Sequence, residues 1–286
     1  MNQRIIDLYD QYTHGPLDRR VFLARLAQMV GGTAAALALV PILEANQARA
    51  ALVPPQDPRL KADRTFYPGT TGSIKGYLAR PKGAMKLPAV VVIHENRGLN
   101  AHIEDVTRRV VLEGFLALAP DFLSPSGGTP ENEDAAREMI GKLDARQTLQ
   151  NAIAAVAFVG KHAQGNGKVG AIGFCWGGAV VGELAVNASE LSAAVVYYGR
   201  QPQAAGVPKI KAPLLLHYAG LDTRINEGIP AFEGALKKAN KQYTLHMYEG
   251  ANHAFNNDTS EARYNKQAAE QAWTRTIAFL KEHLKA

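Results

Sequence analysis

Residues 168–178 read KVGAIGFCWGG, and this stretch decides the fold. Its apolar first half predicts a buried strand, and the Gly-x-Cys-x-Gly pattern that follows leads directly into a helical run over residues 179–186. A nucleophile on such a strand-to-helix turn projects its side chain above the sheet, here as cysteine in place of serine. We therefore predict that Cys175 is a nucleophile, flanked by Gly173 and Gly177 because the turn leaves no room for larger side chains.

Two other interpretations of this glycine-rich turn were considered. One is a structural cysteine without chemistry. The other is a phosphate-binding loop of the dinucleotide type, which requires Gly-x-Gly-x-x-Gly and an acidic residue about twenty positions later. The glycines at positions 170, 173, 177 and 178 do not have that spacing. The helix that starts near Trp176 would also direct its amino end at the thiol, which favours the thiolate.

Strands alternate with long helices through the rest of the chain, which predicts an α/β fold with a mostly parallel central sheet and helices on both faces, as in the α/β-hydrolases. A proline- and glycine-rich segment over residues 124–130 is the one long loop expected to shape a pocket. Further strands are expected over residues 64–67, 73–79, 89–93, 115–119, 193–198, 214–218 and 244–248, and further helices over residues 103–113, 145–162, 227–240 and 261–284.

An acid and a histidine follow later strands, in the order that this fold uses. Asp222 comes just after the strand predicted over residues 214–218, and His253 comes just after the strand over residues 244–248. In such a triad the histidine carries protons, while the acid fixes its tautomer and stabilises the imidazolium. We predict that Cys175, His253 and Asp222 act together.

The segment after the strand over residues 89–93 is where the oxyanion loop belongs. His94 ends this strand, and the backbone N–H groups of Asn96 and Trp176 are expected to hold the developing oxyanion, at about 3 kcal/mol per donor. Leu123, Trp176 and Phe255 are expected to line an apolar substrate pocket. Five other histidines lie within predicted strands or helices and are expected to be packed or solvated: His102, His162, His217, His246 and His283.

With these motifs in place, residues 64–284 resemble the dienelactone hydrolase family, the carboxymethylenebutenolidases. The resemblance implies a Cys-His-Asp triad, no metal or organic cofactor, and hydrolysis of a cyclic enol ester. It also implies that Glu95 pairs with the resting cysteine and helps to form the thiolate; the alternative for Glu95 is a loop carboxylate paired with Arg97. The motifs that carry it are HENRGLN (94–100), APDF (119–122), GAIGFCWGG (170–178), YG (198–199), AGLD (219–222) and GANHAF (250–255).

Two departures from the family pattern bear on the substrate. The family places arginines after the Pro-Asp pair and just past the catalytic histidine, where they bind the substrate's carboxylate. Here these regions, residues 122–128 and 255–258, contain no arginine. An export signal is the second departure, so we expect a periplasmic ester or lactone other than the family's usual substrate.

The first fifty residues read as an export signal. Arg19-Arg20 precede an almost uncharged run over residues 26–43, and Ala48-Arg49-Ala50 is a small-x-small cleavage pattern, which predicts a mature chain from Ala51. The arginine pair resembles a twin-arginine signal, so we expect the export machinery as a partner, a periplasmic product and no membrane anchor after cleavage. The alternative is an uncleaved amphipathic or transmembrane helix. Residues 51–286 are expected to form one α/β-hydrolase domain.

Composition limits the function classes. The 286 residues are 47% hydrophobic with a formal charge of +6, and the basic residues are not clustered, which argues against nucleic-acid binding. A single cysteine excludes an internal disulfide and a Cys-rich structural zinc site. The sequence thus predicts a hydrolase that acts on a small ester or lactone. An acyltransferase or thioesterase and a catalytically silent periplasmic binding protein remain the alternatives.

Overall fold

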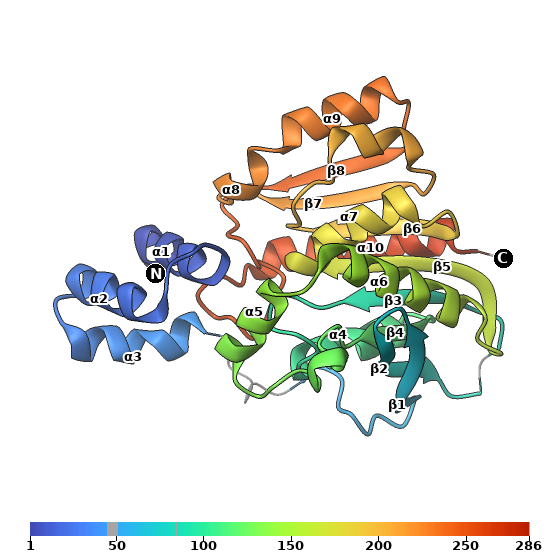
Figure 1. The fold of residues 1–286 in the computed structure, drawn as a ribbon, viewed down its shortest axis with the longest axis horizontal. Helices are drawn as coiled ribbons and strands as arrows, with labels where there is room; N and C mark the ends of the chain where they lie inside the picture. The colour runs from blue at the N-terminus through green and yellow to red at the C-terminus, as the bar shows by residue number, and fades with distance from the viewer. Residues whose placement is uncertain (45–50, 84, 286) are drawn as a thin grey trace.

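The computed structural model describes residues 1–44, 51–83 and 85–285, and its centre is an eight-stranded sheet in the order β1-β2-β4-β3-β5-β6-β7-β8 (Figure 1). The six strands from β4 to β8 run parallel, and β1 and β2 form an antiparallel hairpin at one edge. The strands are β1 Leu60–Gly69, β2 Gly72–Pro81, β3 Leu87–Ile93, β4 Leu116–Pro120, β5 Gly165–Phe174, β6 Leu191–Tyr197, β7 Leu214–Ala219 and β8 Tyr243–Tyr248.

Helices cover both faces of the sheet, because its central strands are apolar on both sides. On one face α6 (Ala145–Gly160), α7 (Trp176–Asn187) and α9 (Ile229–Lys238) pack into one core cluster. On the other face α4 (Ala101–Leu112) and α10 (Lys266–His283) pack into a second cluster. The predicted fold class is confirmed, and Cys175 follows the central strand β5.

Short elements surround the carboxyl ends of the strands. The predicted loop over residues 124–130 contains the 3-10 turn η1 (Ser124–Ser126), and the helix α5 (Glu133–Gly141) that follows was not predicted. The other short elements are η2 (Ala204–Lys209) and α8 (Thr223–Asn226). The side chain of Asn132 caps α5 by accepting from the N–H of Ala135.

Residues 3–43 form three helices with an apolar core of their own: α1 (Gln3–His14), α2 (Arg19–Val30) and α3 (Thr33–Leu43). We call residues 1–43 the N-terminal helical segment. Tyr12 stacks on Phe22 at 4.6 Å between ring centroids inside this core. Figure 1 shows the segment at one end of the sheet, next to α5 and α8.

The apolar run predicted over residues 26–43 is divided between two helices. Gly31 and Gly32 adopt positive φ angles of 84° and 148°, and the chain bends by 112° between α2 and α3. Within the described ranges no single helix has the length and hydropathy for a membrane span, although α2 and α3 meet the criteria jointly. The predicted cleavage pattern, Ala48-Arg49-Ala50, lies outside the described residues.

Candidate active site

The turn between β5 and α7 holds Cys175 in a strained backbone conformation. Its φ and ψ are 55° and −116°, and its N–H donates to the carbonyl of Tyr197 at 3.0 Å. A Cβ at Gly173 would lie 2.1 Å from the carbonyl oxygen of Gly177, and one at Gly177 would lie 2.4 Å from the carbonyl oxygen of His94. The glycines of the motif are therefore required by close backbone approach, and they fix the thiol above the end of the sheet.

His253 and Asp222 meet at the same end of the sheet. Asp222 follows β7 and His253 follows β8, and His253 Nδ1 lies 2.5 Å from Asp222 Oδ2. Burial by itself lowers the pKa of His253, but the carboxylate of Asp222 and the nearby sulfur raise that pKa well above its ordinary value. Within the described part of the chain, the buried Nε2 of His253 has no hydrogen-bond partner. This nitrogen is available for proton transfer.

The group in direct contact with the thiol is a residue that the sequence analysis did not select. His14, the last residue of α1, places its Nε2 3.1 Å from Cys175 Sγ. Its ring also lies edge-on to His253, with 4.5 Å between the ring centroids. Because residues 1–50 read as an export signal, no sequence pattern pointed to a functional histidine there.

The two imidazoles control the charge on the sulfur. Burial by itself raises the pKa of the Cys175 thiol, but His14 and His253 outweigh burial and lower that pKa to about 6. Cys175 is the only cysteine of the chain, and the residue is 6% exposed. A thiolate next to one or two imidazolium rings is therefore the expected state at neutral pH.

Glu95 is buried near this cluster but is held by other groups. Asn257 Nδ2 donates to Glu95 Oε2 at 2.8 Å, and the Tyr198 hydroxyl donates to Oε1 at 3.4 Å. Glu95 and Cys175 line one small cavity together. Arg97, the expected alternative partner of Glu95, instead lies near Glu133 and Asp134 at 3.6 and 3.5 Å.

The expected oxyanion donors lie beside the thiol. Trp176 is the first residue of α7, so its N–H belongs to the amino-terminal groups of the helix that have no partner within the helix. Asn96 and Cys175 line the same two cavities. His94 packs behind them, with its ring stacked on Trp176 at 5.2 Å. Burial lowers the pKa of His94, so this histidine is neutral support for the Trp176 ring.

A cavity of about 580 Å³ opens next to Cys175, between the hydrolase domain and the N-terminal helical segment. Trp176 lines it, as expected. Leu123 and Phe255 do not line either cavity at the thiol, which corrects our prediction for the pocket. Both side chains are fully buried because Leu123 packs under α5 and Phe255 packs within the core on the α10 face.

Cationic side chains border this cavity. Arg137 comes from α5, Arg200 follows β6 and Arg224 lies on α8. Arg200 is exposed and has no ion-pair partner within the described ranges, whereas Arg224 lies 3.3 Å from Asp10. No sequence motif pointed to these arginines, because they lie outside the two regions where the family places its own.

One cluster has the composition of a metal site. His14, Cys175 and His253 each offer one ligand atom, and these atoms lie within 4.8 Å of one another. Two imidazoles and a thiolate are donors that Zn²⁺ accepts. The same atoms also have the arrangement of a nucleophile with two bases, and we interpret them in that way.

The chain is similar to known proteins over most of its length. The model of the Dienelactone hydrolase family matches residues 74–284, and a separate model described as YqhI-like matches residues 1–32. A protein named "Putative carboxymethylenebutenolidase" from Saccharolobus solfataricus is 35% identical over 254 residues, which cover 76% of this chain and 96% of that one. A Bradyrhizobium protein named "Probable 2-oxo-3-(5-oxofuran-2-ylidene)propanoate lactonase" is 33% identical, over 76% and 92% of the two chains.

A solved structure shows the same fold. The crystal structure titled as a "Putative Dienelactone Hydrolase" from Klebsiella pneumoniae has a TM-score of 0.71 and 29% sequence identity. It covers 78% of this chain and 99% of that chain. The similarity is therefore extensive enough to decide the family.

Proposed function

Because this chain belongs to the dienelactone hydrolase family and is a carboxylic ester hydrolase, we propose that it works through an acyl-enzyme on Cys175, with His253 and Asp222 as its proton-transfer pair. The observation that carries the proposal is the strained turn that holds the Cys175 thiol beside His14 and His253, whose imidazoles lower the pKa of the thiol to about 6. Glu95 is proposed as a carboxylate that supports thiolate formation.

The proposed cycle starts from the thiolate. Cys175 Sγ attacks the ester or lactone carbonyl, and the protonated His253 gives its proton to the leaving oxygen as the carbon–oxygen bond breaks. Neutral His253 then takes a proton from water, and the hydroxide adds to the thioester carbonyl. Collapse of this second tetrahedral intermediate releases the carboxylic acid and returns the thiolate. Asp222 keeps the His253 ring oriented throughout.

The developing negative charge on the carbonyl oxygen needs donors that are already in position. We propose the backbone N–H groups of Asn96 and Trp176 for this role. Each such donor is worth about 3 kcal/mol in comparable sites. The rigid elbow and the stacked rings of His94 and Trp176 keep the second donor in place.

For the substrate, we propose an ester or lactone that carries a carboxylate. Arg200 is an exposed, unpaired cation among the described residues, and it borders the 580 Å³ cavity that Cys175 lines. A guanidinium binds a carboxylate with two parallel hydrogen bonds. The Bradyrhizobium relative is named for a propanoate lactone, which supports a ligand of this charge.

The experiment compares the full chain with its Cys175→Ala variant on p-nitrophenyl acetate, a simple butenolide and a dienelactone. We expect turnover only with Cys175, and a mass increase of one acyl group on the protein after a brief reaction. An added alcohol that diverts the acyl group would favour an acyltransferase. Turnover retained by Cys175→Ala would contradict the proposal, and inertness of both proteins together with an unreactive thiol would favour a silent binding protein.

We also propose that the chain is exported to the periplasm through a twin-arginine signal. Arg19-Arg20 and the small-x-small pattern at Ala48 to Ala50 support this proposal. Fractionation of expressing cells should give a periplasmic product that starts at Ala51, and Arg19→Lys with Arg20→Lys should keep the precursor in the cytoplasm. A chain that starts at Met1 and stays in the cytoplasm would contradict export.

A further inference from the structure

We propose that the N-terminal helical segment supplies a second acid–base dyad, Asp10–His14, to the active site of the uncleaved chain. In this inference His14 is a catalytic residue that takes the thiol proton of Cys175, and Asp10 is a positioning residue that acts through His14. The inference rests on the proposed role of Cys175 as the nucleophile. It assigns a function to Asp10 and His14, which lie near the end of α1.

The geometry of His14 resembles that of His253. His14 Nε2 lies 3.1 Å from Cys175 Sγ, and on the other side of the ring Nδ1 lies 2.9 Å from Asp10 Oδ1. Asp10 Oδ1 makes no hydrogen bond within the described residues, so its contact with His14 is an ion pair. Thr13 Oγ1, at 2.9 Å, and the backbone carbonyl oxygen of Asp10, at 3.3 Å, also lie next to Nδ1. Two imidazole–carboxylate pairs thus converge on one sulfur.

The partners of His14 select its tautomer. The Thr13 hydroxyl lies 3.0 Å from the carbonyl of Tyr9 and donates to it, so Thr13 Oγ1 is free to accept from His14 Nδ1–H. With the hydrogen on Nδ1, the lone pair of Nε2 faces the thiol. His14 is therefore set up to accept a proton from Cys175.

The local charges support the same direction of transfer. Burial by itself lowers the pKa of His14, but the sulfur of Cys175 and the Asp10 carboxylate raise it, against the effect of His253. Burial raises the pKa of Asp10, yet His14, His253 and Arg224 lower it, so Asp10 is charged at neutral pH. The other titratable or charged groups that line the two cavities together with His14 are Tyr9, Asp18, Glu95, Arg97, Glu133, Arg137, Glu138, Tyr198, Arg200, Arg224 and Arg263.

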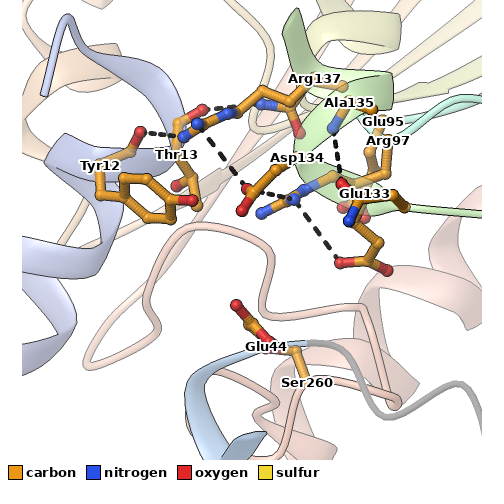
Figure 2. A network of polar contacts seen from close by, with 12 residues as sticks. Tyr12, Thr13, Glu44, Glu95, Arg97, Glu133, Asp134, Ala135, Arg137 and Ser260 are labelled. Atoms are coloured by element: carbon orange, nitrogen blue, oxygen red, sulfur yellow. Dashed lines mark hydrogen bonds and ion pairs between the residues drawn. The ribbon is translucent and has the colours of Figure 1, made fainter. Parts of the chain in front are cut away.

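Contacts outside the dyad hold α1 over the thiol. Asn96 Nδ2 donates to the carbonyl of Thr13 at 2.9 Å, and Gln3 Nε2 donates to Asn252 Oδ1 at 2.6 Å. Figure 2 shows Arg137 of α5 reaching the carbonyl of Tyr12, and the guanidinium of Arg137 also lies 4.2 Å from the centre of the Tyr12 ring. The segment is thus tied to three separate parts of the hydrolase domain.

The proposed step conserves atoms and electrons. The S–H bond of Cys175 breaks, the proton moves to Nε2 of His14, and the electron pair stays on the sulfur. The new imidazolium is stabilised by the Asp10 carboxylate. His253 is then not required for ionising the thiol, and its proton serves the leaving oxygen and later the attacking water. Cys175 lines the 580 Å³ cavity while the N-terminal helical segment is docked. A substrate in this cavity can therefore contact the thiol with the dyad in place.

The test measures the rate of iodoacetamide alkylation against pH for the full chain, in EDTA, because Cys175 is its only cysteine. Wild type should show an inflection near pH 6. His14→Gln should move it upward by about one to two units, the effect of losing one adjacent opposite charge. Asp10→Asn should move it upward by less. His102→Gln is the matched control, since His102 pairs with Asp258 at 3.3 Å and lines neither cavity at Cys175.

Amide hydrogen exchange in α1 distinguishes a change in thiol ionisation from a loss of docking of the N-terminal helical segment. An upward shift in Asp10→Asn with α1 still protected supports the dyad. If His14→Gln increases amide exchange in α1, the alkylation profile of Asp10→Asn decides between the dyad and a loss of docking. Unchanged profiles in both variants, or faster ester turnover in His14→Gln than in wild type, would overturn the inference, since the segment would then only cover the thiol.

This test is independent of the proposed function and of export. Alkylation reports the ionisation of Cys175 whether or not any ester of the panel is hydrolysed, whereas Cys175→Ala tests turnover. Cleavage after Ala50 would remove both Asp10 and His14, so the dyad acts only in chains that retain residues 1–43. A chain with the Ala51 terminus is expected to have the less acidic thiol.

Discussion

At the scale of single residues, the site depends on which groups share the proton of Cys175. The proton that leaves the sulfur has two nearby imidazoles to which it can move, and each imidazole has its own carboxylate. An ordinary cysteine titrates near pH 8.5, whereas this thiol titrates at about 6 because the two rings outweigh burial. The pH dependence of the reaction follows from that difference.

For the full chain, which retains His14, we expect kcat/KM for p-nitrophenyl acetate to rise as the pH increases through about 6 and then to level off near neutrality. The sign follows from the thiolate being the reactive form, since protonation below the thiol pKa removes the nucleophile. Stopped-flow rates between pH 4.5 and 8.5 measure this profile. A rise only above pH 8 would show that the thiol has an ordinary pKa in solution.

Asp222→Asn should lower kcat by about 10²- to 10⁴-fold, the range by which a correctly placed acid–base group accelerates such reactions. The amide cannot stabilise the His253 imidazolium, and it favours the wrong tautomer of the ring. Asp258→Asn, at a carboxylate paired with His102 and Arg109, is the control and should leave kcat near the wild-type value. Equal rates for Asp222→Asn and wild type would remove Asp222 from the mechanism.

Arg200→Ala should raise KM for esters that carry a carboxylate by about 10- to 150-fold, because one charge-assisted hydrogen bond contributes roughly 1.5–3 kcal/mol. KM for neutral p-nitrophenyl acetate should stay unchanged. The comparison of the two substrates on the same variant is the measurement. A parallel change in both KM values would assign Arg200 to the shape of the cavity rather than to recognition of charge.

At the scale of elements, the turn from β5 to α7 was the most predictable part of the chain. Gly173 and Gly177 could be identified because the turn leaves no space for a Cβ. Asp222 and His253 could be placed at one edge because parallel strands end on the same side of a sheet. The packing of α1 next to Cys175 was not predictable. An export signal and a set of short packed helices have the same apolar sequence pattern. Leu123 and Phe255 were misplaced because an apolar residue beside a motif can equally belong to the core behind it.

Gly177→Ala should destabilise the fold by about 1–3 kcal/mol or prevent soluble expression, because the new Cβ would meet the His94 carbonyl oxygen at 2.4 Å. Gly234→Ala in α9 is the matched control, since a Cβ there has no heavy atom within 4 Å. That change should stabilise the helix by about 0.5–1 kcal/mol. Urea unfolding of both variants measures the difference, and equal stability of the two would contradict the close-approach argument.

At the scale of the whole molecule, the candidate active site lies between two units with separate cores. The N-terminal helices share a cluster around Tyr9, Tyr12 and Phe22, while the hydrolase domain has its own clusters on the two faces of the sheet. Polar contacts join the two units: Arg137 of α5 donates to the Tyr12 carbonyl (Figure 2), and Arg19 of α2 pairs with Asp134 at 2.5 Å. Such a boundary can open without unfolding either core.

Arg137→Ala tests this boundary, because it removes both the hydrogen bond to the Tyr12 carbonyl and the contact with the Tyr12 ring. We expect faster amide exchange in α1, unchanged exchange in β5, and a thiol inflection that moves upward by less than in His14→Gln, since the segment would remain docked part of the time. Arg146→Ala, at an exposed arginine on α6, is the control. Exchange that increases equally in α1 and β5 would mean that the segment and the hydrolase domain open as one unit, and the site would then not lie at a separable boundary.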